Sequence, residues 1–125
     1  MTLDQALSPT IIVVANDLKL LKLLSLALKI EFACEVLSFI SARSVEETIM
    51  YVRPDLLILD EHMVDCNART FAARMHSIPG IEGVPTLFIN GNISYQSESQ
   101  EYVIRSLGSS WNIEVLYAAV YELFD

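Results

Sequence analysis

Two short apolar runs, each ended abruptly by polar residues, constrain the fold of this chain most strongly. The first is Ile11-Ile12-Val13-Val14, followed by Ala15-Asn16-Asp17, and the second is Leu56-Leu57-Ile58-Leu59, which ends on Asp60. Runs this short, rich in branched side chains and without polar alternation, predict strands that are buried on both faces. Strands of this kind occur in parallel sheets with helices on either side.

The rest of the chain continues an alternation of helices and strands. Helices are predicted over 18–31, where Asp17 is placed to cap the first turn, and over 44–52, 67–77 and 111–124. Ser44 and Glu47 form a capping box for the second helix. Further strands are predicted at 35–40, 85–89 and 102–104. This order favours a flavodoxin-like α/β fold, a doubly wound five-stranded parallel sheet in the order 2-1-3-4-5.

The segment from Gly91 to Glu101 interrupts this pattern. It is rich in serine, with poor helix formers and no apolar stripe, so the helix due at this point should be short or irregular. At 125 residues the chain is long enough for one domain. We expect an N-terminal lead over 1–10 and the domain itself over 11–125.

Charge and hydropathy exclude several classes of partner. The net charge of -8 should repel phosphate backbones, so direct nucleic-acid binding is not expected. No apolar run approaches the roughly 20 residues of a membrane span and no signal peptide begins the chain, so we expect a cytoplasmic protein without a membrane partner. Cys34 and Cys66 have no metal-binding or redox spacing and are expected to be buried thiols.

Polar side chains follow several of the predicted strands. They are Asn16 and Asp17 after the first strand, Asp60 after the third, Asn90 after the fourth and Arg105 after the fifth. In an open parallel sheet, functional groups gather at the carboxyl ends of the strands, so these residues should face one crevice.

Three segments resemble the receiver domains of response regulators, the signalling modules of two-component pathways and phosphorelays. The segments are 13–17, an apolar strand that leads into polar residues; 54–63, which contains Asp60 and Met63; and 84–89. The likeness extends from Ile11 to Phe124. It implies that Asp60 is the phosphoacceptor, that Asn90, Tyr102 and Arg105 are switch residues, and that the chain is a signalling module and not an enzyme. A histidine kinase or another signalling protein would be its partner.

The departures from the receiver pattern concern the chemistry of the site. Receivers hold Mg²⁺ with two acids after the first strand and the acceptor aspartate, and here Ala15 and Asn16 stand in place of those acids. A magnesium site formed by Asn16, Asp60 and His62 should therefore be weak or absent. Asn90 replaces a hydroxyl residue, and Arg105 replaces a lysine. A competing alignment puts Ser109 in that lysine position. These changes indicate an atypical or pseudo-receiver.

Three hypotheses about function remain open. The first is a degenerate receiver that acts through protein–protein interaction, and the second is a conventional response regulator phosphorylated on Asp60. The third is a small flavodoxin-like ligand-binding protein or enzyme, although the chain has no glycine-rich phosphate loop and no nucleophile elbow. His62 and His76 lie in no triad-like pattern and are expected at the surface.

The C-terminal third suggests how such a module would associate. It is acidic and rich in aromatic residues, which are enriched at interaction hot spots. We expect Tyr117 and Tyr121 to be interface residues. They would support a homodimer or partner complex through the face that the segment 91–101, the strand 102–104 and the last helix form in receivers.

Overall fold

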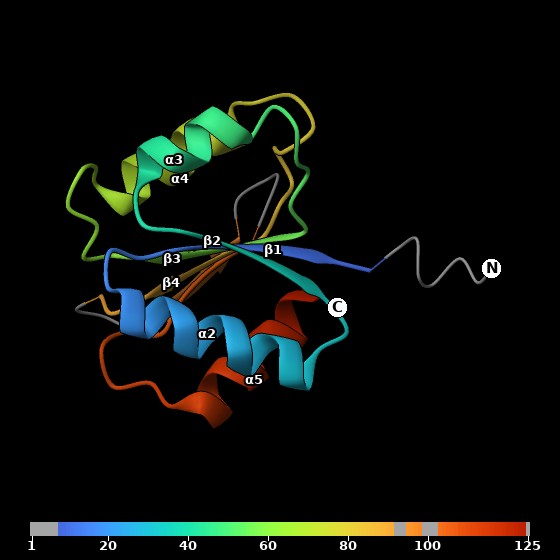
Figure 1. Ribbon diagram of the computed structural model, residues 1–125, viewed down its shortest axis with the longest axis vertical. Coiled ribbons are helices and arrows are strands. Elements are labelled where there is room, and N and C mark those ends of the chain that lie inside the picture. The colour runs from blue at the N-terminus through green and yellow to red at the C-terminus, as the bar shows by residue number, and fades with distance from the viewer. Residues whose placement is uncertain (1–7, 92–94, 99–102, 125) are drawn as a thin grey trace.

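The computed structural model describes residues 8–91, 95–98 and 103–124. The chain forms three layers, in which two pairs of helices cover the opposite faces of one sheet (Figure 1). The strands are β1 (Thr10–Val14), β2 (Glu35–Phe39), β3 (Leu56–Asp60), β4 (Thr86–Ile89), β5 (Tyr95–Glu98) and β6 (Val103–Ser106). The helices are α2 (Leu18–Glu31), α3 (Ala42–Thr48), α4 (Ala68–His76) and α5 (Ile113–Phe124).

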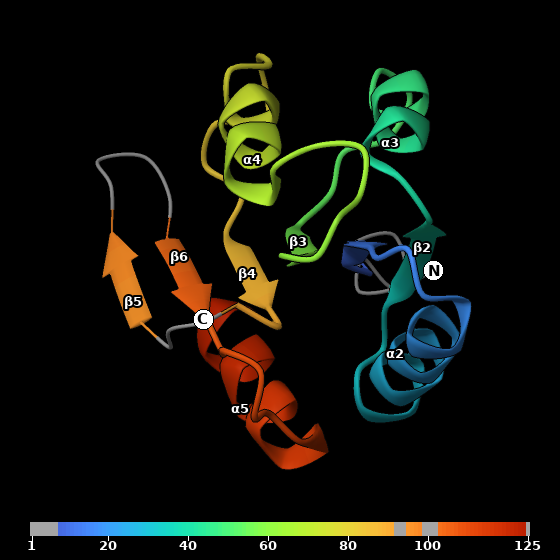
Figure 2. The same cartoon turned by 90° about the vertical axis from the view of Figure 1, so that its left-hand side faces the viewer.

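The sheet has the order β2-β1-β3-β4-β6-β5. Its first five strands are parallel, so the predicted order 2-1-3-4-5 is confirmed, with β6 as the fifth predicted strand. The sequence did not predict the sixth strand, β5, which pairs antiparallel with β6 at the edge of the sheet (Figure 2). In the segment from Gly91 to Glu101, the residues that the structure describes contain this strand and no helix.

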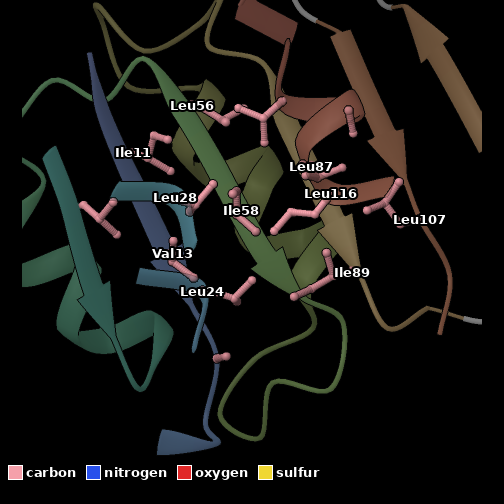
Figure 3. Close-up of a cluster of buried hydrophobic side chains, with 14 of the residues drawn as sticks. Ile11, Val13, Leu24, Leu28, Leu56, Ile58, Leu87, Ile89, Leu107 and Leu116 are labelled. Atoms are coloured by element: carbon pink, nitrogen blue, oxygen red, sulfur yellow. The ribbon is translucent and has the colours of Figure 1, made fainter. Parts of the chain in front are cut away.

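The strands are buried because their side chains alternate between two apolar layers. One layer lies between the sheet and helices α2 and α5 (Figure 3). It contains Ile11, Val13, Ile58, Leu87 and Ile89 from the strands and Leu24, Leu28 and Leu116 from the helices. The other lies between the sheet and helices α3 and α4, and includes Ile12, Val14, Leu57, Leu59, Phe88 and Phe71. Burial on both faces explains the uninterrupted apolar runs of β1 and β3.

Capping side chains set where the helices begin. The Asp17 carboxylate accepts hydrogen bonds from the backbone N–H groups of Lys19 and Leu20, as predicted. For α3, the predicted capping box at Ser44 is wrong, because Ser41 is the N-cap and accepts from the Ser44 N–H at 3.2 Å. The Asp65 carboxylate reinforces this earlier start by accepting from Ala42 and Arg43.

Two further details correct or extend the sequence analysis. His76 is buried and not at the surface. Polar partners accompany its burial, since its Nε2 lies 2.9 Å from the carbonyl oxygen of Val84 and 3.0 Å from the Thr86 hydroxyl. His62 is exposed as predicted.

Within the described residues, none of the helices is long and apolar enough to cross a bilayer.

Candidate functional site

Asp60, the predicted phosphoacceptor, ends β3 at the carboxyl edge of the sheet. It is 3% exposed, and its Oδ1 accepts a hydrogen bond of 2.8 Å from the backbone N–H of His62. The same loop is held further along, because Asp65 bonds to the first turn of α3 and Asn67 caps α4. The Asp60 side chain is therefore buried and has a local partner in the loop.

The end of β1 supplies little negative charge to this edge. Ala15 is fully buried and has no polar side-chain atom, whereas Asn16 is exposed. The Asp17 carboxylate, which follows them, is directed to the N-terminus of α2. The acids that receivers use after this strand thus have no counterpart here.

We tested whether these residues fit the Mg²⁺ that the fold family binds. Mg²⁺ requires several oxygen ligands near ideal octahedral geometry and gains affinity from carboxylates. Over the described residues, no three His, Cys, Asp or Glu side chains form a cluster that could hold a metal ion. His62 contributes a backbone N–H to Asp60, and its side chain is exposed. The donor set of Asn16, Asp60 and His62 does not fit a magnesium site.

Glu61, the residue after the predicted phosphoacceptor, forms the most connected polar group at this edge. Its carboxylate accepts from Arg69 Nε at 3.1 Å and from Arg69 Nη2 at 3.3 Å, in a two-pronged ion pair. Its Oε2 also accepts from the Ser106 hydroxyl at 3.2 Å. The carboxylate therefore connects β3 to α4 and to the end of β6. Bidentate arginine pairs of this kind are stronger and more specific in geometry than single contacts.

Two neighbours hold this group in position. The Arg69 guanidinium lies over the ring of Phe88, 4.5 Å from its centroid, which orients the arginine from the α4 side of β4. Gly91 leaves space for the carboxylate, since a Cβ atom added there would lie 2.0 Å from Glu61 Oε2. The Glu61 side chain is 17% exposed, so the ion pair is partly shielded from water.

Asn90, the first predicted switch residue, has a structural role at the end of β4. Its backbone has a φ of 64°, in the left-handed region that asparagine tolerates better than β-branched residues. Its side-chain oxygen accepts from the Trp111 indole N–H at 2.9 Å, and its backbone N–H donates to the carbonyl of Gly108. Both contacts point to the segment before α5.

Arg105, the second predicted switch residue, lies inside β6 opposite Leu87. Gly108 lies level with Asn90, because its carbonyl accepts from the Asn90 N–H. Arg105 comes three residues before Gly108, so it lies roughly 10 Å from the carboxyl edge of the sheet. Its guanidinium forms an ion pair with Glu122 of α5. Within the described part of the chain, neither Arg105 nor Ser109 bonds to Asp60, whose carboxylate accepts from the His62 N–H. Tyr102, the third predicted switch residue, lies outside the described residues.

The predicted interface tyrosines are used within the domain. The Tyr117 hydroxyl donates to the carbonyl of Ala27 at 2.7 Å, and the Tyr121 hydroxyl donates to Glu31 at 2.6 Å. Both rings also pack on Phe32, with centroid separations of 5.7 and 4.7 Å. The hydrogen bond to the Glu31 carboxylate raises the pKa of Tyr121, because it favours the protonated phenol. These tyrosines join α5 to α2, and their role at an interface stays a prediction.

The sequence reasoning missed the group formed by Glu61, Arg69 and Ser106. One available signal was spacing, since Arg69 lies eight residues after Glu61, near the start of the helix predicted over 67–77. The contact with Ser106 depends on tertiary structure, because 45 residues separate it from Glu61.

Comparisons with known proteins identify the fold. The sequence matches no family model, and no curated protein matches it. Among solved structures, the chemotaxis response regulator CheY4 of Vibrio cholerae aligns with a TM-score of 0.78 and 16% identity, over 93% of this chain and 98% of that one. A putative response regulator from Chloroflexus aurantiacus aligns with a TM-score of 0.75 and 20% identity, over 94% and 98% of the two chains.

A third similar structure is a receiver domain that belongs to a histidine kinase. The signal receiver domain of a signal transduction histidine kinase from Syntrophus aciditrophicus aligns with a TM-score of 0.75 and 15% identity, over 94% of this chain and 90% of that one. All three similarities extend over nearly the whole chain at low identity. The chain therefore has the CheY-like, flavodoxin-type fold of response-regulator receiver domains.

Proposed function

We propose that this chain is a receiver-type signalling module that works through protein–protein interaction and without Mg²⁺-assisted phosphoryl transfer. It would be a binding module in a two-component pathway or phosphorelay, and not an enzyme. The receiver fold supports the general role, and the altered residues at the carboxyl edge of the sheet support the atypical one.

The carboxylate of Glu61 is the observation that carries this proposal. It lies next to Asp60 in the sequence and binds a hydroxyl from the end of β6 and an arginine from α4. A phosphoryl group on Asp60 would be an anion that recruits cationic and hydroxyl donors. In this chain a permanent anion already recruits such donors, so the edge of the sheet is held in one arrangement without modification.

The neighbouring residues support the same interpretation. Asn90 is held by Trp111, and Arg105 is held by Glu122. Asp60 is buried, and the loop that follows it is anchored at the N-termini of α3 and α4. A residue that reports phosphorylation must exchange one set of contacts for another. The partners that it already holds oppose that exchange. We infer that the module has one signalling conformation.

The conventional response regulator remains the second candidate, because Asp60, the expected phosphoacceptor, ends β3. It would require phosphorylation of a carboxylate without the two acids that receivers have after the first strand. The third hypothesis, a small ligand-binding protein or enzyme, has no specific observation in its favour at this edge.

The test of the proposal is Glu61→Gln, which keeps the shape of the side chain and removes its charge. We expect amide chemical shifts to change around Gly91, Ser106 and the start of α4, which are distant in sequence from residue 61. Glu46→Gln is the matched control, since Glu46 forms an exposed ion pair with Arg74. Its effects should stay at the α3–α4 surface. Shift changes confined to the neighbours of residue 61 would contradict the proposal.

Gly91→Ala tests the same group from the opposite side. The added methyl group would occupy the position of Glu61 Oε2, so the carboxylate must move. Because the end of a side chain can shift at small cost, we expect a folded protein with perturbed Ser106 and Arg69 resonances. A spectrum identical to wild type beyond residue 91 would show that the carboxylate does not hold this edge.

The partner classes also belong to this proposal. A histidine kinase or another signalling protein is the expected partner, in the cytoplasm. A homodimer through the β5, β6 and α5 side of the domain stays a prediction, as does the part of Tyr117 and Tyr121 in it. Light scattering over a range of protein concentrations measures that association.

A further inference from the structure

One flank of α2 carries an apolar groove that the site described above does not use. The groove has a volume of about 380 Å³ and lies between α2 and the edge strand β2, where Leu18, Leu21, Leu26 and Ile40 line it. Leu18 and Leu26 are each 61% exposed, and Ile40 is 54% exposed. A single exposed leucine is ordinary, but adjacent apolar side chains around a groove are typical of an interaction site.

The charge at this groove is opposite to that of the chain as a whole. All three lysines of the sequence, Lys19, Lys22 and Lys29, lie on α2, although the net charge is -8. Lys22 and Lys29 line the groove. In the part of the chain that the structure describes, no carboxylate lies within 4.0 Å of either ammonium group. The groove thus combines apolar walls with two cations.

The groove lies on the side of α2 that faces away from α5. At 3.6 residues per turn, Lys22 and Lys29 lie on one side of the helix, while Ala27 and Glu31 lie on the other. Ala27 and Glu31 accept hydrogen bonds from the tyrosines of α5. At the other wall, β2 is the last strand of the sheet on its side (Figure 2). No described element of the chain covers this surface.

We propose that this groove binds an acidic amphipathic helix of a partner protein. Lys22 and Lys29 are seven residues apart, so they lie about 10 Å apart along α2 and match carboxylates two turns apart on a second helix. Apolar side chains between those carboxylates would pack against Leu18, Leu26 and Ile40, in the manner of a helix bound in a groove. This goes beyond the proposed function and does not depend on the Glu61 group.

The experiment uses two labelled helical peptides as probes. Both are built on alanine and carry leucines at i, i+3 and i+7. They differ only at two flanking positions two turns apart, where one peptide has glutamates and the other has lysines. Fluorescence anisotropy with the full chain gives their affinities, and amide chemical shifts of the protein locate the binding site. We expect the glutamate peptide to bind at least tenfold more tightly than the lysine peptide, with shifts at residues 18–29 and 38–40.

Charge reversal supplies the decisive variants. Lys22→Glu with Lys29→Glu should reverse the preference between the peptides, whereas Lys19→Glu should leave it unchanged, because Lys19 is exposed on the same helix and does not line the groove. Leu26→Ser should weaken the binding of the glutamate peptide without changing which peptide is preferred. These are exposed positions, so the variants are expected to fold.

Three results would overturn the proposal. The first is equal affinity for the two peptides, or a preference that the double variant leaves unchanged. The second is a dimer in sedimentation that the double variant dissociates, which would make the groove an interface between copies. The third is binding to phosphatidylserine vesicles together with no preference for the glutamate peptide, which would assign the lysines to an anionic membrane surface.

Discussion

The indole N–H of Trp111 donates a hydrogen bond of 2.9 Å to the side-chain oxygen of Asn90. This contact joins the end of β4 to the segment that leads into α5. Asn90 stands where receivers have a hydroxyl switch residue, and its left-handed backbone gives a local reason for asparagine. The substitution therefore reflects a different turn as well as a different side chain.

Restoring a receiver-like threonine should accordingly destabilise the domain. Asn90→Thr puts a β-branched residue at a φ of 64° and removes the acceptor for Trp111. We expect a loss of about 1–3 kcal/mol in the free energy of unfolding, from backbone strain and the lost hydrogen bond. Urea unfolding followed by the fluorescence of Trp111, the single tryptophan, measures it. Asn90→Gly keeps the backbone and should lose less, so equal stability of Asn90→Thr and wild type would contradict the account.

Magnesium binding should be weak in the wild-type chain and stronger in Asn16→Asp. The exposed Asn16 can accept a carboxylate without burying it, and it lies two residues after Val14, where the strand that pairs with β3 ends. Calorimetric titration with MgCl₂ should show no sub-millimolar site in wild type and a measurable site in the variant. Asn112→Asp, at the start of α5, is the control and should not bind. A sub-millimolar wild-type site would refute this prediction.

The contact between α5 and α2 should contribute to stability through Tyr117. Tyr117→Phe removes the hydrogen bond to the Ala27 carbonyl and should lower the free energy of unfolding by about 0.5–1.5 kcal/mol. Tyr51→Phe is a suitable control, because Tyr51 is 85% exposed. Equal unfolding midpoints for the two variants would mean that the Tyr117 hydroxyl does not stabilise the domain.

Cys34 should react slowly with alkylating reagents near neutral pH. Burial raises the pKa of its thiol, and the nearby Lys29 ammonium opposes that shift only in part. Because the thiolate is the reactive form, its alkylation rate should rise as pH increases through this raised pKa. Mass spectrometry of digested protein gives the rate, and Lys29→Met should slow it further at a given pH. Alkylation at pH 8 as fast as in unfolded protein would be inconsistent with the raised pKa.

The parts of the fold that the sequence predicted are those with strong local signals. The apolar runs of β1 and β3 and the Asp17 cap of α2 required no knowledge of tertiary structure. The strand β5 was missed because its sequence, Tyr-Gln-Ser-Glu, is polar and becomes a strand by pairing with β6. The start of α3 was misplaced because Ser41 and Ser44 both offer a capping hydroxyl, and the Asp65 carboxylate that reinforces the earlier start lies 23 residues away from Ala42.

In the candidate site too, some residues could be located from local sequence and others depend on tertiary structure. Asp60 was located by the strand that ends on it, whereas the partners of Asn90 and Arg105 depend on how α5 packs. The ion pair of Glu61 with Arg69 spans the loop between β3 and α4, and the Ser106 contact joins residues 45 positions apart. Sequence patterns identify which side chains reach an edge of a sheet, but competing partners decide what each one binds.

The central claim is that the edge of the sheet is held by Glu61 and not by phosphorylation of Asp60. The most direct measurement is intact mass after incubation with Mg²⁺ and a small-molecule phosphodonor such as acetyl phosphate, with Asp60→Asn as the control. The account predicts the same unmodified mass for wild type and for the control. A stoichiometric phosphoryl adduct that appears on wild type and is absent from Asp60→Asn would contradict it.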